Sequence, residues 1–139
     1  MGEVMRPYPQ PDRDSAPFWE AQNRHELQFQ RCSNCAAVRY PPGPLCPQCR
    51  SFQSEWIASS GRGTVYSFTI VQHQTHPAFP VPYTVLLVEM GEGPRVVAQL
   101  RDADGRRPEI GSRVHVAWED YAQQSLPVFV LDEAQTADG

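Results

Sequence analysis

Four cysteines are the residues whose types and spacing most clearly suggest chemistry. All four lie within CSNCAAVRYPPGPLCPQC at 32–49. They form two Cys-x-x-Cys pairs, Cys32 with Cys35 and Cys46 with Cys49. Each pair predicts a tight turn that directs two sulfur atoms at one ion, and the PPGP sequence between the pairs turns the chain so that they can meet. Four thiolates in this arrangement are typical of a tetrahedral zinc site.

We interpret the four cysteines as the ligands of one structural zinc ion per chain. Cysteine fills all four positions, so no position stays open for water or substrate, as a catalytic zinc site requires. Catalytic zinc and a redox dithiol are the alternatives, although two facing pairs are seldom a redox centre. Disulfides are disfavoured because the opening residues, MGEVMRPYPQ, lack an apolar signal region. We therefore expect a cytoplasmic protein with reduced thiols.

The sequence contains no recognised catalytic motif. With all four cysteines bound to zinc, none is free to act as a nucleophile. The G-x-S-x-G, P-loop, H-E-x-x-H and G-x-G-x-x-G patterns are also missing. We therefore expect no catalytic residue in this chain when it acts alone.

Charge and hydropathy argue against two classes of partner. The net charge is −4, and all 12 basic residues are arginine. A nucleic-acid-binding protein normally needs a basic face that displaces counterions, so we expect no nucleic-acid partner. No apolar run approaches the roughly 20 residues of a membrane span, so we expect no membrane insertion.

Residues 1–25 predict an extended arm followed by a short helix. The first 13 residues carry three prolines and little apolar content, which favours an extended chain. A helix is predicted over residues 14–25, with Asp14 or Ser15 as N-cap and Pro17 in the first turn.

Two aromatic residues, Phe18 and Trp19, anchor this helix. So short a helix needs tertiary support. The two rings either pack on the ribbon of the same chain or are buried against a partner, and both interpretations stay open.

The rest of the chain predicts a mainly β protein. Segments in which apolar and polar residues alternate flank the cysteines and predict a rubredoxin-like, three-stranded zinc ribbon over residues 26–60. Five alternating strands follow within residues 61–134, with no helix expected between the third and the fourth. Five short strands suit a C-terminal OB-fold barrel, because an open sheet of this size would expose its edges. We expect a disordered tail at 135–139.

The segment HQTHPAFPVPY at 73–83 is unusual for a turn between strands. It carries His73, His76, Phe79 and Tyr83 together with three prolines. Loops of this kind often carry function. It is either a rigid, proline-locked loop with solvated histidines or a contact for a ligand or partner, and both interpretations stay open.

Taken together, the segments resemble the zinc-ribbon OB-fold proteins that accompany thiolase-like enzymes and are often filed as a domain of unknown function. The resemblance covers nearly the whole chain. It rests on FWEA at 18–21, QRCSNC at 30–35, YPPGPLCPQC at 40–49, SEWIASSGRGTVYSFTIV at 54–71 and PYTVLLVEM at 82–90.

Two residues depart from the family pattern. Ala36 stands where glycine is usual after the second cysteine, and Gly43 stands where arginine is usual. A left-handed alanine costs roughly 1 kcal/mol, which metal binding offsets. The missing arginine removes a positive group near the ribbon and argues against a phosphate contact there.

The resemblance implies a non-catalytic accessory subunit of a thiolase-superfamily enzyme, with two copies of each protein in a heterotetramer. The complex would act on an acyl-CoA, and the related steroid side-chain aldolases cleave a carbon–carbon bond of a CoA thioester by a retro-aldol reaction. Phe18, Trp19 and the 73–83 loop would then contact the partner or the acyl-CoA. The alternatives are a nucleic-acid-binding OB-fold module and a stand-alone acyl-CoA-binding protein or enzyme that uses the loop as its site.

Overall fold

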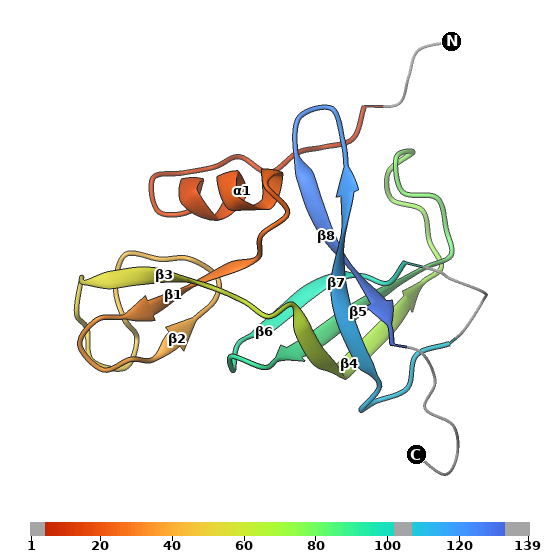
Figure 1. Ribbon diagram of the computed structural model, residues 1–139. Coiled ribbons are helices and arrows are strands. Elements are labelled where there is room, and N and C mark those ends of the chain that lie inside the picture. The colour runs from red at the N-terminus through yellow and green to blue at the C-terminus, as the bar shows by residue number, and fades with distance from the viewer. Residues whose placement is uncertain (1–4, 102–106, 133–139) are drawn as a thin grey trace.

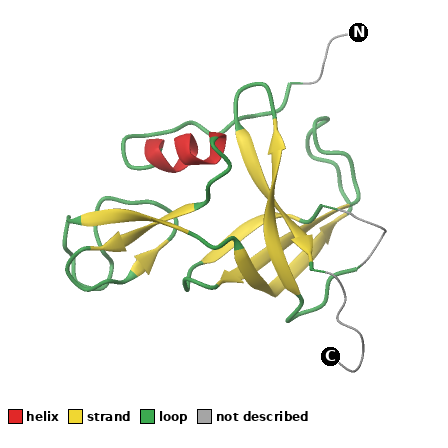
Figure 2. Ribbon diagram, viewed as in Figure 1, coloured by secondary structure: helices red, strands yellow, loops and turns green. Residues whose placement is uncertain are grey.

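The computed structural model describes residues 5–101 and 107–132 of the 139-residue chain. The predicted disordered tail at 135–139, the first four residues of the predicted arm and the last two of the predicted barrel region lie outside these ranges. The chain forms a helix, a small three-stranded sheet and a five-stranded sheet, shown in Figures 1 and 2.

The N-terminal half contains a short helix and the predicted ribbon. The ribbon has the three strands that the sequence predicted, and they form an antiparallel sheet with the order β2-β1-β3. The bounds of these elements are α1 Ala16–Asn23, β1 Gln28–Cys32, β2 Val38–Arg39 and β3 Ser54–Ala58.

The helix begins and ends two residues inside its predicted range. Ser15 precedes it, but the side chain of Ser15 does not cap the helix. Instead, the Ser15 N–H donates to Asp12 Oδ1 at 2.8 Å and the Asp12 N–H donates to Ser15 Oγ at 3.0 Å. This reciprocal pair has the form of a capping box one turn earlier, and it satisfies donors that a helix start leaves free.

The C-terminal half is the predicted five-stranded barrel. The strand order is β6-β5-β4-β7-β8, all antiparallel. Two contacts join the chain just after β6 to β8 and so bring the two edges of the sheet together. Leu100 forms a parallel β-bridge with Phe129, and the Arg101 N–H donates to the Phe129 carbonyl at 2.8 Å. The strands are β4 Arg62–Val71, β5 Tyr83–Met90, β6 Arg95–Gln99, β7 Arg113–Asp120 and β8 Ser125–Leu131.

One strand, β4, bends and pairs with β7 on one side and with β5 on the other. It pairs with β7 through residues 62–64 and with β5 along most of its length, and the register shifts between Val65 and Ser67. A bulge at this point bends the strand and increases its twist, which a small barrel needs to close. No helix occurs between β6 and β7 in the part of that connection that the structure describes.

A single apolar core joins the two halves. The barrel interior contributes most of its buried side chains, and the helix and ribbon contribute Phe18, Leu27 and Phe29. Each fully buried side chain of this size stabilises the fold by about 1.5–3 kcal/mol. The barrel members are Val65, Leu86, Val88, Met90, Val96, Val114 and Phe129.

Polar contacts also join the halves. Where the ribbon leads into the barrel, Glu92 accepts a hydrogen bond from Ser59 Oγ at 2.6 Å and one from the Ser60 N–H at 2.9 Å. At the end of α1, Asn23 Oδ1 accepts a bond from the Ser125 N–H at 2.8 Å. These contacts hold the ribbon and barrel in one arrangement. Among the described residues, no helix is long and apolar enough to cross a membrane.

Candidate metal centre and loop 73–83

The four cysteines lie on two turns of the ribbon that share one backbone geometry. In the first turn the Ala36 N–H donates to the Cys32 carbonyl at 2.9 Å, and in the second the Arg50 N–H donates to the Cys46 carbonyl at 2.8 Å. Ala36 and Arg50, which each follow the second cysteine of a pair, have φ angles of 68° and 66°. Ala36 therefore adopts the left-handed conformation whose cost was considered from the sequence, and Arg50 adopts the same conformation.

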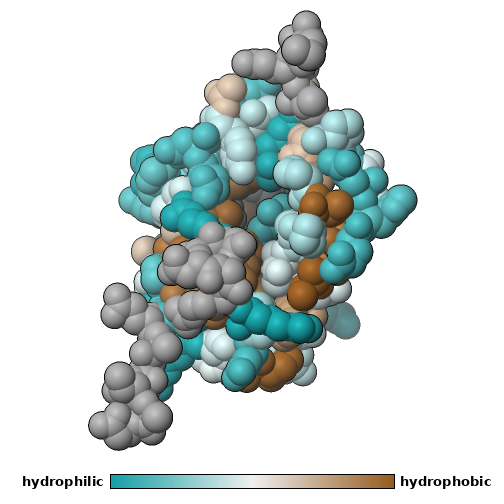
Figure 3. Space-filling model, turned by 90° about the vertical axis from the view of Figure 1, so that its right-hand side faces the viewer, coloured by the Kyte–Doolittle hydropathy of each residue, from teal (hydrophilic) through white to brown (hydrophobic). Residues whose placement is uncertain are grey.

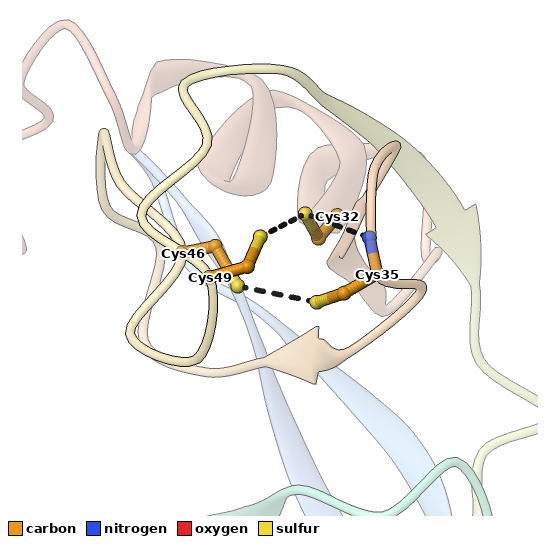
Figure 4. Close-up of side chains that lie close together, drawn as sticks. All are labelled: Cys32, Cys35, Cys46 and Cys49. Carbon is orange, nitrogen blue, oxygen red and sulfur yellow. Dashed lines mark hydrogen bonds between the residues drawn. The ribbon is translucent and has the colours of Figure 1, made fainter.

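The turns bring the four sulfur atoms together, as Figure 4 shows. All four lie within 4.8 Å of one another, with 3.5 Å between the sulfurs of Cys32 and Cys49 and 3.6 Å between those of Cys35 and Cys46. Tetrahedral zinc with Zn–S bonds of about 2.3 Å separates its sulfur ligands by about 3.8 Å. The cluster therefore has the size of a tetrahedral zinc–thiolate site.

Hydrogen-bond donors surround the sulfurs. Cys32 Sγ accepts from the N–H groups of Asn34 and Cys35, each at 3.4 Å, and Cys49 Sγ accepts from Asn34 Nδ2 at 3.4 Å. The bond from the Cys35 N–H is the main cause that lowers the pKa of Cys32 to about 6. Donors of this kind stabilise the thiolate form that binds a metal.

The crowding of the thiols has the opposite effect on Cys35. A hydrogen bond from Ala37 lowers the pKa of Cys35, but desolvation and the neighbouring thiols outweigh it and raise the pKa to about 12. Four thiolates this close together therefore need a cation between them. The donor set and its spacing fit a metal ion, and Cys32 and Cys46 are buried. Within the described ranges, no other group of three or more such ligands gathers.

Loop 73–83 brings together three of its four predicted residues. The rings of His76 and Phe79 lie 5.6 Å apart, and those of Phe79 and Tyr83 lie 6.3 Å apart. His76 Nδ1 accepts a hydrogen bond from the Ala78 N–H at 3.0 Å, which fixes the ring. His73 is exposed and lies outside this aromatic row.

One partner of this loop, Arg6, was not predicted from the sequence. The guanidinium of Arg6 lies 4.7 Å from the centre of the Phe79 ring and 4.2 Å from that of Tyr121. The arm therefore runs between loop 73–83 and the β7–β8 turn, as Figure 1 shows. Only tertiary structure brings these three segments together, so no local pattern could have revealed the contact.

The two helix aromatics lie differently from each other. Phe18 is 3% exposed, and the centres of its ring and the Tyr40 ring lie 5.7 Å apart. Phe18 therefore packs within the chain and leaves almost no surface for a partner. Trp19 is half-buried, and its ring meets Phe18 edge-on at 5.1 Å. Trp19 therefore keeps apolar surface that a partner can cover.

Further apolar surface lies on the outer face of the barrel. Val97 is 57% exposed and, with Leu87 and Val85, borders a shallow hollow across β4, β5 and β6. On the side of the molecule seen in Figure 3, apolar patches are set among hydrophilic residues and do not form one continuous surface.

Comparison with known proteins identifies both halves of the chain. A family profile described as the ChsH2 rubredoxin-like zinc ribbon domain matches residues 19–55, and one described as the ChsH2 C-terminal OB-fold domain matches residues 56–119. Together the two profiles cover the ribbon and most of the barrel.

Two similar curated proteins are larger than the region they share with this chain. The probable enoyl-CoA hydratase alpha subunit of Thermomonospora curvata is 42% identical over 128 residues, which are 91% of this chain and 40% of that protein. The 3-oxo-4,17-pregnadiene-20-carboxyl-CoA hydratase alpha subunit of Mycobacterium tuberculosis is 38% identical over 130 residues, which are 94% and 41%. The chain thus spans about two fifths of these relatives.

A third curated protein and one solved structure are also similar to this chain. The benzoylsuccinyl-CoA thiolase subunit BbsA of Thauera aromatica is 30% identical over 79 residues, 57% of this chain and 54% of that protein. The solved structure of the Ltp2-ChsH2(DUF35) aldolase contains a chain that is 41% identical and superposes with a TM-score of 0.83, over 89% of this chain and 98% of that one. The chain therefore belongs to the DUF35 family and has its ChsH2-type architecture, a rubredoxin-like zinc ribbon followed by a C-terminal OB-fold domain.

Proposed function

We propose that this chain is a non-catalytic accessory subunit of a thiolase-superfamily enzyme that acts on an acyl-CoA. The observation that carries the proposal is the match to the DUF35 chain of the Ltp2-ChsH2(DUF35) aldolase, which extends over 98% of that chain. The similarity to a benzoylsuccinyl-CoA thiolase subunit supports the same class of partner. In this proposal the chain stabilises the enzyme and helps to shape its acyl-CoA site.

The proposed reaction is carbon–carbon bond cleavage on a CoA thioester, of which the retro-aldol release of a steroid side chain is one example. The partner supplies the catalytic groups, and two copies of each protein form a heterotetramer. We place the complex in the cytoplasm, where thiols stay reduced and available to a metal. Each copy of this chain holds one structural zinc ion through its four cysteines.

Two regions of the surface are suited to the partner. Trp19 and the hollow beside Val97 offer apolar area, and a buried aromatic anchor typically contributes 2 kcal/mol or more to binding, as an order of magnitude. The aromatic row of loop 73–83 would lie near the entrance used by the acyl-CoA. Its prolines limit the entropy that the loop loses on binding.

A hydratase is the second candidate partner, because the two hydratase alpha subunits are 42% and 38% identical to this chain. Assays of the complex separate the two candidates. A thiolase-type aldolase complex cleaves a β-hydroxyacyl-CoA into two products, whereas a hydratase complex adds water to an enoyl-CoA. We expect cleavage.

The test is co-expression with a candidate partner, a thiolase-like protein of the same organism. We expect Trp19→Ala to weaken assembly at least about tenfold, since truncation of an interface anchor costs more than 1.4 kcal/mol. The double variant His76→Ala, Phe79→Ala should assemble normally but turn over acyl-CoA poorly. His73→Ala is its matched control, because His73 is an exposed residue of the same loop outside the aromatic row.

For the arm, deletion of residues 1–11 is a cleaner change than deletion of residues 1–25, which would also remove the core residue Phe18. We expect the shorter deletion to weaken assembly without unfolding the ribbon. If the partner alone is soluble and fully active, and the two proteins elute separately at micromolar concentration, the proposal is wrong.

A further inference from the structure

A cavity of about 220 Å³ lies between α1 and the barrel, on the side of β6 and β8. Figure 1 shows the helix beside β8, above the ribbon. An apolar cavity of about 150 Å³ already holds a benzene molecule, so this one has room for a ring or a short alkyl chain with a small head group. Its apolar walls include Phe18, Trp19, Leu27, Val96, Leu126 and Val128.

Two polar side chains in the cavity wall have hydrogen-bonding atoms without a partner. Gln22 is 1% exposed, and its Oε1 is buried and unpaired. Arg6 Nε is also buried and unpaired. Across the described ranges there are three such side-chain atoms, and two of them belong to residues that line this cavity. Each such group left without a partner costs about 1–3 kcal/mol, which a ligand that pairs with it removes.

Among the described residues, Arg6 also has no counterion. Its guanidinium makes cation–π contacts with Phe79 and Tyr121, which favour the positive charge but do not neutralise it. Its N–H groups can still donate hydrogen bonds to an acceptor. No carboxylate forms an ion pair with Arg6 within residues 5–101 and 107–132. The positive charge of Arg6 beside the apolar walls therefore suits an anionic ligand.

We propose that this cavity binds a small amphipathic carboxylate. The apolar body lies against the walls, and the carboxylate accepts hydrogen bonds from the N–H donors of Arg6. Gln22 supplies a further bond, because its amide can turn either its oxygen or its nitrogen toward the cavity. The ligand is distinct from the CoA thioester of the proposed function, since the cavity is smaller than the roughly 300 Å³ at which pockets for drug-sized ligands begin.

The experiment uses the full zinc-loaded chain without any partner, so its outcome does not depend on the proposed function. Phenylacetate and hexanoate are titrated into isotope-labelled protein, and phenylacetamide serves as the neutral match to phenylacetate. NMR follows the side-chain amide of Gln22 and the Nε–H of Arg6. We expect saturable shifts of both groups with the carboxylates, and at least about tenfold weaker binding of the amide, because hydrogen bonds to charged groups are the stronger ones.

Variants test the role of the two polar residues. Arg6→Met keeps the apolar length but removes the charge and the donors, and it should weaken binding at least about tenfold. Arg13→Met is the matched control, because Arg13 is an exposed arginine on the same arm, and it should bind like the wild type. If Arg6→Met fails to fold, Gln22→Glu gives the second test, since a carboxylate beside the ligand should weaken binding by a similar factor.

Three results would overturn the proposal. The first is the absence of saturable shifts at Gln22 up to about 10 mM phenylacetate or hexanoate, a range that detects even weak binding. The second is equal affinity of the wild type and Arg6→Met. The third is binding of CoA thioesters without binding of the free acids, which would make the cavity part of an acyl-CoA site.

Discussion

The ribbon and the barrel differ in what holds them together. Within residues 26–58 the fully buried apolar side chains, apart from cysteine, are Leu27 and Phe29, whereas the barrel buries seven. The ribbon instead concentrates four thiols at one point. A small module with so little apolar core needs a metal to fold, while the barrel can rely on its own interior.

The junction between the halves is polar as well as apolar. The contacts of Glu92 with Ser59 and Ser60 fix the ribbon at the entry to the barrel, and Asn23 fixes the end of the helix on β8. We therefore expect that a metal-dependent half is attached to a half that keeps its shape without metal. Four changes test this contrast, from the largest expected effect to the smallest.

Loss of the metal site should unfold the ribbon and spare the barrel. Replacement of Cys46 by Ser, or removal of zinc with a chelator, removes a contribution of the order of 10 kcal/mol, the scale measured for structural zinc in small domains. NMR spectra should lose the dispersed signals of residues 26–58 and keep those of the barrel strands. Ser33→Ala, an exposed change in the first turn, should have no effect. A zinc-free protein with an intact ribbon would contradict this prediction.

A cavity in the barrel core should have the converse effect. Leu86 is fully buried, so Leu86→Ala should lower the free energy of unfolding by about 2–5 kcal/mol through lost burial and an unfilled volume. Urea denaturation measures the change, and elemental analysis should still find one zinc per chain. Val97→Ala, on the exposed face of the same barrel, should cost far less. An equal cost at both positions would show that the barrel interior does not hold the fold.

The junction should respond to pH through Glu92. Partial burial raises the pKa of Glu92, but the hydrogen bonds from Ser59 and Ser60 outweigh it and lower the pKa below its usual value of 4.5. The carboxylate therefore contributes stability that is present above pH 4.5 and is lost as the pH falls through the lowered pKa.

Glu92→Gln should lower the free energy of unfolding by about 1 kcal/mol at pH 7, a value that allows for the exposure of the group. Wild type and variant should converge as the pH falls below the usual pKa of glutamate, with urea denaturation as the measurement. Glu20→Gln, an exposed change on α1, serves as the control and should match the wild type throughout. A difference between wild type and Glu92→Gln that persists under acidic conditions would rule out the carboxylate as its cause.

The smallest change concerns the first cysteine turn. Ala36 has a φ of 68°, a conformation that glycine adopts without the penalty of roughly 1 kcal/mol that alanine incurs. Ala36→Gly should therefore raise the chelator concentration that unfolds the ribbon. Ala37→Gly, at the next position, should lower it or leave it unchanged. Equal or lower resistance of Ala36→Gly would mean that the left-handed turn is not strained.

The sequence predicted the parts of the molecule that local patterns encode. The spacing of the cysteines predicted the thiol cluster, because two tight turns are enough to bring the sulfurs together. Alternation of apolar and polar residues predicted the three ribbon strands and the five barrel strands, because alternation follows which face of a sheet is buried.

Features that depend on distant contacts were not predictable. The capping pair of Asp12 with Ser15 was missed because the helix was expected to start directly at its N-cap. The Arg6 contact with Phe79 and Tyr121 joins three segments far apart in the sequence. Gln22 looked like an ordinary helical polar residue, and only the packing of α1 against the barrel buries it. A single sequence carries no local signal for contacts of this kind.

We propose that this chain works as a zinc-bearing subunit of a thiolase-like enzyme. Native mass spectrometry of the co-expressed pair tests it most directly, because one spectrum reports the partner, the stoichiometry and the bound metal. We predict two copies of each protein, with one zinc ion for each copy of this chain. A spectrum in which this chain appears only alone, while the thiolase-like protein forms its own active assembly, would contradict the account.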